Sequence, residues 1–171
     1  MCTVSYRQSF KFARLAFASL ALGLGLLASA PASAFDNERV ALVIGNDAYP
    51  NEPLRNAAND ARAMQKTLQE LGFKVVFKQN ADINTMRAAA VEFAKMMDGA
   101  SAAVFFYAGH GIQYSNKNYL IPVDAKLMSE PEIVYYAMEV GQILDSVEEA
   151  KVRHKFIILD ACRNNPFRNL F

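Results

Sequence analysis

A histidine and a cysteine each follow a short apolar run in this sequence. His110 stands in Tyr107-Ala108-Gly109-His110-Gly111, and Cys162 stands in Asp160-Ala161-Cys162-Arg163-Asn164. A thiolate is a strong nucleophile, and a neighbouring imidazole lowers the pKa of the thiol and moves protons to and from it. The two residues are therefore candidates for a Cys-His pair that transfers acyl groups. For the thiol alone, a buried structural cysteine is the alternative.

The elements that must position these residues begin after a predicted leader. Arg7, Lys11 and Arg14 precede an apolar stretch over residues 15–30, and small residues follow over 31–34. This pattern is typical of a signal peptide, and it predicts a leader over residues 1–34, a domain over 35–171, and a periplasmic or secreted protein. An uncleaved anchor is the alternative, but the apolar run is shorter than the roughly 20 residues that span a bilayer, so no stable membrane span is expected after cleavage.

The charge of the predicted domain excludes one class of partner. The whole chain carries a net charge of +1, and cleavage after Ala34 removes basic residues only. The remaining domain is slightly acidic and has no basic face, so nucleic acid is not an expected partner. Cys162 is then the single cysteine of the domain, and it cannot form an internal disulfide.

Short apolar runs alternate with segments of helical period along the domain. They predict four strands and three helices, which is typical of an α/β fold with a mainly parallel sheet. The predicted strands are residues 40–45, 74–78, 102–107 and 155–160, and the predicted helices are 59–71, 84–97 and 140–150. Short right-handed connections favour the strand order 2-1-3-4, with helices on both faces. Asp82 or Asn84 is expected to cap the second helix, and residues 118–121 are expected to form a short hairpin arm.

Ligands of such sheets bind at the carboxyl ends of the strands. The third predicted strand leads to His110 and the fourth leads to Cys162, so both reactive groups are expected at one edge. A flavodoxin-like binding domain is a poor alternative, because it would need a glycine-rich phosphate loop after the first strand, and residues 46–53 contain no glycine.

Five segments together resemble bacterial members of the caspase and metacaspase clan. About 50 residues separate the histidine from the cysteine in the caspase pattern, as they do here. The resemblance runs from about Arg39 to the end of the chain. The segments, in the order of the family, are Val43-Ile44-Gly45-Asn46, Asn59-Asp60-Ala61, Tyr107-Ala108-Gly109-His110-Gly111, Asn118-Tyr119-Leu120-Ile121-Pro122-Val123-Asp124 and Asp160-Ala161-Cys162-Arg163-Asn164-Asn165-Pro166-Phe167.

The resemblance implies a caspase-like three-layer sandwich and a cysteine endopeptidase that acts on peptides or proteins. His110 would be the general base and acid, and Cys162 would be the nucleophile. The backbone N–H groups of Gly111 and Cys162 would stabilise the oxyanion. No metal or other cofactor is expected.

Two carboxylates are candidates for the substrate pocket. Asp160 stands where a caspase has the glutamine that helps to hold an acidic side chain, so it favours cleavage after Arg or Lys. By resemblance to metacaspases, Asp60 would be a second acidic residue of this pocket, with a helix N-terminal role as the equal alternative. Asp124 could echo a ligand of a metacaspase calcium site, but an ordinary turn carboxylate is favoured, because calcium needs several oxygen ligands.

The family's sheet normally continues for two strands beyond the nucleophile, and these are absent here. The sequence predicts a domain truncated after the nucleophile, with its fourth strand at an open edge. A fragment of a longer protein, an inert truncated product, or completion by a partner chain all fit this pattern. The alternative function is therefore a catalytically incomplete caspase-like module that binds or regulates a partner.

Overall fold

A parallel four-stranded sheet forms the centre of the molecule. The computed structural model describes residues 38–161 of the 171-residue chain, so Cys162 and the predicted leader over 1–34 lie outside the described residues. The strands are β1 (Arg39–Gly45), β2 (Phe73–Gln79), β3 (Ala102–Ala108) and β7 (His154–Asp160), in the order β2-β1-β3-β7. All neighbours are parallel, which confirms the predicted strands and their order.

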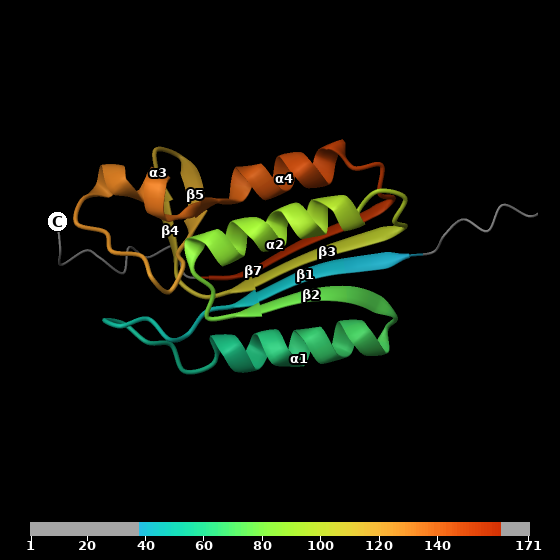
Figure 1. Cartoon of the computed structure of the whole chain (residues 1–171), viewed down its shortest axis with the longest axis horizontal. Coiled ribbons are helices and arrows are strands. Elements are labelled where there is room, and N and C mark those ends of the chain that lie inside the picture. Colours follow the sequence, from blue (N-terminus) through green and yellow to red (C-terminus); the bar gives the residue numbers. More distant parts are fainter. Residues whose placement is uncertain (1–37, 162–171) are drawn as a thin grey trace, which may run out of the picture. The chain divides into compact units, whose positions relative to one another are not determined.

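Helices cover both faces of this sheet. Helix α1 (Ala57–Glu70) lies on one face, and α2 (Ile83–Met96) and α4 (Val140–Glu149) lie side by side on the other (Figure 1). Each helix lies within two residues of its predicted bounds. The described residues therefore form three layers, as a caspase-like α/β fold requires.

Local chemistry sets where these helices begin and end. The Asp82 carboxylate accepts a hydrogen bond from the backbone N–H of Thr85 at 2.6 Å, so it caps α2. Helix α1 is followed by Gly72, which has φ +79° and donates its N–H to the carbonyl of Gln69. A left-handed backbone suits glycine, which explains why the helix ends there.

Two apolar layers hold the helices to the sheet. The interior strands β1 and β3 are buried on both faces, apart from Arg39 at the start of β1. Alternate residues of each strand point to opposite faces, so Val40, Leu42 and Ile44 pack towards α2 and α4, whereas Ala41 and Val43 pack towards α1.

Strand β7 is the exposed edge of the described sheet. It pairs with β3, and α1 packs on β1, β2 and β3 without covering β7. Phe156 and Ile158 on the α1 face are 54% and 41% exposed as a result. Within residues 38–161, β7 therefore has one neighbour and is an outer strand of the sheet.

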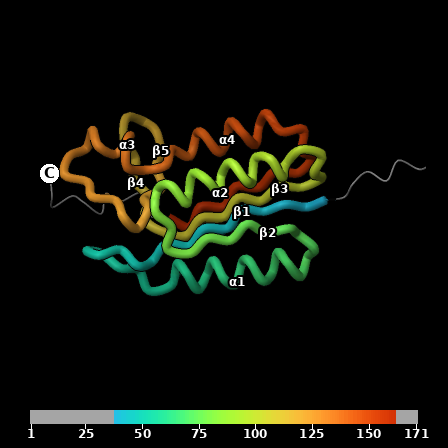
Figure 2. Tube along the Cα trace, in the orientation of Figure 1, coloured from blue at the N-terminus to red at the C-terminus, as the bar shows by residue number. Residues whose placement is uncertain are grey.

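A smaller antiparallel sheet stands at the carboxyl end of the parallel one. It contains β4 (Gly111–Tyr114), β5 (Lys117–Leu120) and β6 (Met138–Glu139), and the short helices η1 (Glu130–Glu132) and α3 (Ile133–Tyr136) lie between β5 and β6. Figure 2 shows β4, β5 and α3 at the end of the parallel sheet towards which its strands run. The expected hairpin arm is thus β5, and sequence reasoning missed its partners β4 and β6.

No helix within residues 38–161 is long and apolar enough to cross a membrane.

Candidate active site

The ends of β3 and β7 lie side by side. Ala108 pairs with Asp160 in the parallel register, and the N–H of Gly109 donates to the carbonyl of Asp160 at 3.3 Å. His110 comes two residues after Ala108, at the expected edge of the sheet. Cys162 comes two residues after Asp160 and lies outside the described residues.

A main-chain carbonyl holds the imidazole of His110. Nε2 of the ring lies 2.7 Å from the carbonyl oxygen of Glu52, in the segment between β1 and α1. A carbonyl oxygen can only accept, so Nε2 carries the proton in the neutral ring and Nδ1 is free to accept one. Sequence reasoning missed Glu52, because a main-chain contact across 58 residues leaves no mark on residue type.

Two buried tyrosines contact the same histidine. The rings of Tyr49 and His110 have their centroids 4.3 Å apart at 51°. The Tyr49 hydroxyl accepts from the N–H of His110, and the Tyr107 hydroxyl donates to the His110 carbonyl. Burial raises the pKa of Tyr49, and burial followed by the contact with Tyr49 raises that of Tyr107. Both hydroxyls therefore keep their protons near neutral pH.

The amide of Gly111 is directed towards the free edge of β4. Gly111 pairs with Leu120 in the antiparallel register, and the N–H of Ile121 donates to the carbonyl of His110 at 3.0 Å. Hydrogen-bonded and non-hydrogen-bonded pairs alternate along such a ladder, so the Gly111–Leu120 pair is the non-hydrogen-bonded one. The Gly111 N–H therefore points away from β5 and is not used in this ladder.

Both candidate pocket carboxylates lie on the α1 side of the sheet. Asp160 shares the face of Phe156 and Ile158 by strand alternation, and it is exposed. Asp60 is exposed in the first turn of α1, where its N–H bonds to the carbonyl of Asn56. Asp60 therefore occupies the helix N-terminal position that was its structural alternative. This position leaves its exposed carboxylate accessible to a substrate.

Gly45 lets α1 approach the carboxyl end of β1. A Cβ at Gly45 would lie 2.4 Å from the Ala61 Cβ and 2.8 Å from the Ala57 carbonyl oxygen, closer than side-chain carbons approach. Gly45 at the end of β1 and Ala61, which follows Asp60, therefore pack directly against each other. This contact places Asp60 near the carboxyl end of β1.

Asn46 ties three segments together beneath the site. It is completely buried, and its Oδ1 accepts from the Ala81 N–H at 2.9 Å while its Nδ2 donates to the carbonyls of Ala81 and Ile121. In the sequence, Asn46 stood out only as the last residue of the segment Val43-Ile44-Gly45-Asn46. The structure gives it a positional role, because it joins the segments after β1, β2 and β5.

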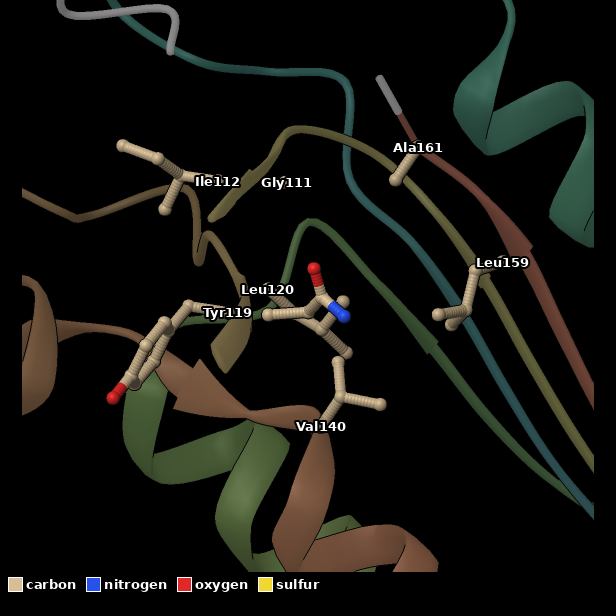
Figure 3. A pocket seen from close by; sticks show the side chains of 8 residues that line it. Gly111, Ile112, Tyr119, Leu120, Val140, Leu159 and Ala161 are labelled. Carbon is tan, nitrogen blue, oxygen red and sulfur yellow. The ribbon is translucent and has the colours of Figure 1, made fainter. Parts of the chain in front are cut away.

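An apolar pocket of about 160 Å³ is lined by Leu159 among others (Figure 3). By strand alternation, Leu159 points to the face of the sheet opposite that of Asp160. Gly111 and Ala161, which line it, are the sequence neighbours of His110 and Cys162. Its other lining residues are Ile112, Asn118, Tyr119, Leu120 and Val140. Because no charged side chain lines it, this pocket does not correspond to the acidic pocket that the sequence predicts for Asp60 and Asp160.

Asp124 has a structural partner. Its Oδ1 accepts from the N–H of Ile83 at 3.2 Å, in the first turn of α2. An anionic group is favourable at a helix N-terminus. This contact agrees with the turn-carboxylate interpretation. Within residues 38–161, no group of three or more His, Cys, Asp or Glu side chains gathers as metal ligands would.

Comparisons with known proteins agree with this architecture. The profile of the caspase domain family matches residues 38–170. The chain is 32% identical over 127 residues to the human mucosa-associated lymphoid tissue lymphoma translocation protein 1, covering 74% of this chain and 15% of that protein. The mouse homologue is 31% identical over 127 residues, which are again 74% of this chain and 15% of that protein. The chain thus spans less than a fifth of the length of these relatives.

A solved caspase shares the fold. The crystal structure of the Drosophila initiator caspase Dronc superposes with a TM-score of 0.57 at 17% identity, over 75% of this chain and 50% of that one. At this identity the likeness concerns the fold.

Proposed function

Because the chain belongs to the caspase domain family of cysteine peptidases, we propose that it is an endopeptidase in which Cys162 attacks peptide bonds with the help of His110. The observation that carries this proposal is the 2.7 Å contact between His110 Nε2 and the Glu52 carbonyl. It fixes the neutral ring with Nδ1 unprotonated, as a base for a thiol needs. The ring stands at the end of β3, beside the strand that leads to Cys162.

The proposed reaction begins with transfer of the thiol proton to Nδ1 of His110. The thiolate attacks the substrate carbonyl carbon, and the negative charge on the carbonyl oxygen is stabilised by the N–H groups of Gly111 and Cys162. His110 then gives its proton to the departing amine, and a thioester remains on Cys162. A water molecule, deprotonated by His110, attacks the thioester, and the acid product leaves as the thiol is restored.

We further propose that the enzyme cleaves after Arg or Lys. Asp160 precedes the nucleophile by two residues, and Asp60 stands at the same edge on the same side of the sheet. Their carboxylates would bind a guanidinium or ammonium group through charge-assisted hydrogen bonds. An aspartate substrate would be repelled, which distinguishes this pocket from one built for acidic residues.

The proposed chemistry needs no metal or other cofactor, because a thiol, an imidazole and backbone amides supply every group the steps require. The proposed location is the periplasm or the extracellular space, on the strength of the leader pattern over residues 1–34. The substrate is a peptide or protein.

The second candidate is a caspase-like module that binds a partner without cleaving it. The exposed edge of β7, with Phe156 and Ile158 uncovered on one face, favours this function. In that case a partner chain would pair with β7 and complete the sheet.

One experiment separates the two functions. The purified chain is given fluorogenic peptides that end in Arg, Lys or Asp, beside the Cys162→Ala variant. Turnover of the Arg and Lys peptides that disappears in the variant supports the peptidase. Equal fluorescence from both proteins refutes peptidase activity of this chain and favours the binding module.

A further inference from the structure

Two buried tyrosine hydroxyls hold the main chain of His110 on both sides. The N–H of His110 donates to the Tyr49 hydroxyl at 3.0 Å, and the Tyr107 hydroxyl donates to the His110 carbonyl at 2.8 Å. Tyr49 is 7% exposed and Tyr107 is fully buried. Because both hydroxyls belong to buried side chains, removing either one leaves a backbone group of His110 without that partner at a place that water reaches poorly.

The Tyr49 hydroxyl takes the place of one hydrogen bond of a β-ladder. His110 and Ile121 are the next pair in the register of β4 and β5, and the Ile121 N–H donates to the His110 carbonyl. The reciprocal bond of such a pair runs from the His110 N–H to the Ile121 carbonyl. Here the Tyr49 hydroxyl lies between these groups, accepting from His110 and donating to Ile121 at 2.9 Å.

The segment that supplies this hydroxyl also holds the ring of His110. Tyr49 packs its ring against the imidazole, and Glu52, three residues later, accepts from Nε2. The main chain and the side chain of the histidine are therefore fixed by one loop between β1 and α1. A shift of His110 against this loop would break the Nε2 contact.

Gly109 is the residue that lets both hydroxyls approach. A Cβ at this position would lie 2.6 Å from the Tyr107 oxygen and 2.8 Å from the Tyr49 oxygen. The two hydroxyls are themselves 3.2 Å apart. The glycine before the histidine thus leaves the space that the tyrosine pair occupies.

We propose that Tyr49 and Tyr107 are positioning residues for His110, which keep its imidazole against the Glu52 carbonyl as the Nε2–H tautomer with Nδ1 ready to accept a proton. Neither hydroxyl takes part in bond making or breaking. The catalytic consequence rests on the proposed peptidase function, but the effect on the tautomer does not.

The first test measures the tautomer directly in the full chain. The protein has two histidines, so ¹⁵N NMR of the ring nitrogens gives two sets of signals, and His154→Gln assigns them. At a pH where the rings are neutral, wild-type His110 is expected as the Nε2–H form. Tyr49→Phe, which keeps the aromatic ring and removes the hydroxyl, is expected to give a mixture of both tautomers.

Two other hydroxyl deletions complete this test, one at the second proposed positioning residue and one as a control. Tyr107→Phe is expected to act in the same direction as Tyr49→Phe, and the double variant to differ little from either single one, because the two hydroxyls hold one residue. Tyr114→Phe, in β4, is expected to leave the tautomer unchanged. A purely structural role would lower the stability of Tyr49→Phe without changing the His110 signals, and that result would overturn the proposal.

The second test measures peptide hydrolysis by the same variants. Tyr49→Phe is expected to lower kcat at least about tenfold while KM changes less than about twofold, because a misplaced base slows the chemistry more than it weakens binding. An unchanged kcat in an active enzyme would contradict the proposal. If wild type itself cleaves no peptide, the peptidase function fails for this chain, and the NMR result alone decides the role of the tyrosines.

Discussion

Nε2 of His110 lies 2.7 Å from the main-chain carbonyl oxygen of Glu52, and Pro53 follows directly. A residue that precedes proline is restricted to extended conformations, so the direction of the Glu52 carbonyl is limited before any substrate arrives. In the proposed peptidase, this main-chain oxygen would orient the imidazole as a carboxylate does in many catalytic triads.

The first prediction concerns the reactivity of Cys162. His110→Ala is expected to slow alkylation of this thiol by iodoacetamide at pH 7 about tenfold or more, because an unassisted thiol is only a few per cent thiolate there. The rate is measured by mass spectrometry of the peptide that contains Cys162. His154→Ala is the control, since His154 begins β7 at the opposite end of the strand. Equal rates in the two variants would refute the pairing of His110 with Cys162.

The second prediction concerns specificity. Asp160→Ala is expected to lower kcat/KM for Arg and Lys peptides by about 10- to 100-fold, because it removes a charge-assisted hydrogen bond. Alkylation of Cys162 should continue at the wild-type rate. Asp98→Ala, which removes an exposed carboxylate after α2, is the control for net charge. Unchanged cleavage at basic residues by Asp160→Ala would show that the pocket lies elsewhere.

The third prediction concerns the contact between α1 and β1. Gly45→Ala is expected to destabilise the fold by about 1–3 kcal/mol, because the new Cβ would overlap the Ala61 side chain and the Ala57 carbonyl. Urea unfolding measures the change. Gly141→Ala is the matched control: the heavy atoms nearest to its Cβ belong to the end of the Glu139 side chain, which is ion-paired with the exposed Lys117, and not to the backbone, and alanine favours the α4 helix. A loss of stability in the control but not in Gly45→Ala would contradict the packing argument.

The fourth prediction concerns Asn46. Asn46→Ala is expected to cost about 1–3 kcal/mol of unfolding free energy, because the buried N–H of Ala81 loses its acceptor. Asn84→Ala, an exposed asparagine in the first turn of α2, should change it by less than about 0.5 kcal/mol. If both variants unfold at the same urea concentration, Asn46 does not carry the stabilising role that its hydrogen bonds indicate.

The fifth prediction concerns stability at alkaline pH. Burial raises the pKa of Tyr49 and of Tyr107 above the ordinary tyrosine value of 10.0. The folded protein therefore holds these protons more tightly than the unfolded chain. This contribution is complete below about pH 10 and is lost as the pH rises from there through the folded pKa values. Tyr107→Phe is expected to lose stability less steeply than wild type above pH 10 in urea titrations, and an identical slope would contradict the assignment.

The sequence by itself determined the parallel sheet and the edge of that sheet at which the candidate site residues lie. Strands such as residues 40–45 and 102–107 can be recognised locally. Each is a run of apolar, β-branched and aromatic residues that has the length of a strand and lies between helical segments. Strand order then follows from short right-handed connections. His110 could be placed at this edge because it follows shortly after β3. Asp160 could be placed there because it ends β7, and Asp60 because it lies in the first turn of α1.

Only the tertiary structure decided how His110 is held. Its partners are the carbonyl of Glu52 and the hydroxyls of Tyr49 and Tyr107, and the bonds to Glu52 and Tyr49 cross 58 and 61 residues. A main-chain carbonyl is present at every residue, and tyrosines are common in apolar cores, so neither residue type marks these positions. Their role arises because the loop after β1 folds back over the end of β3, and that path depends on packing of the whole domain.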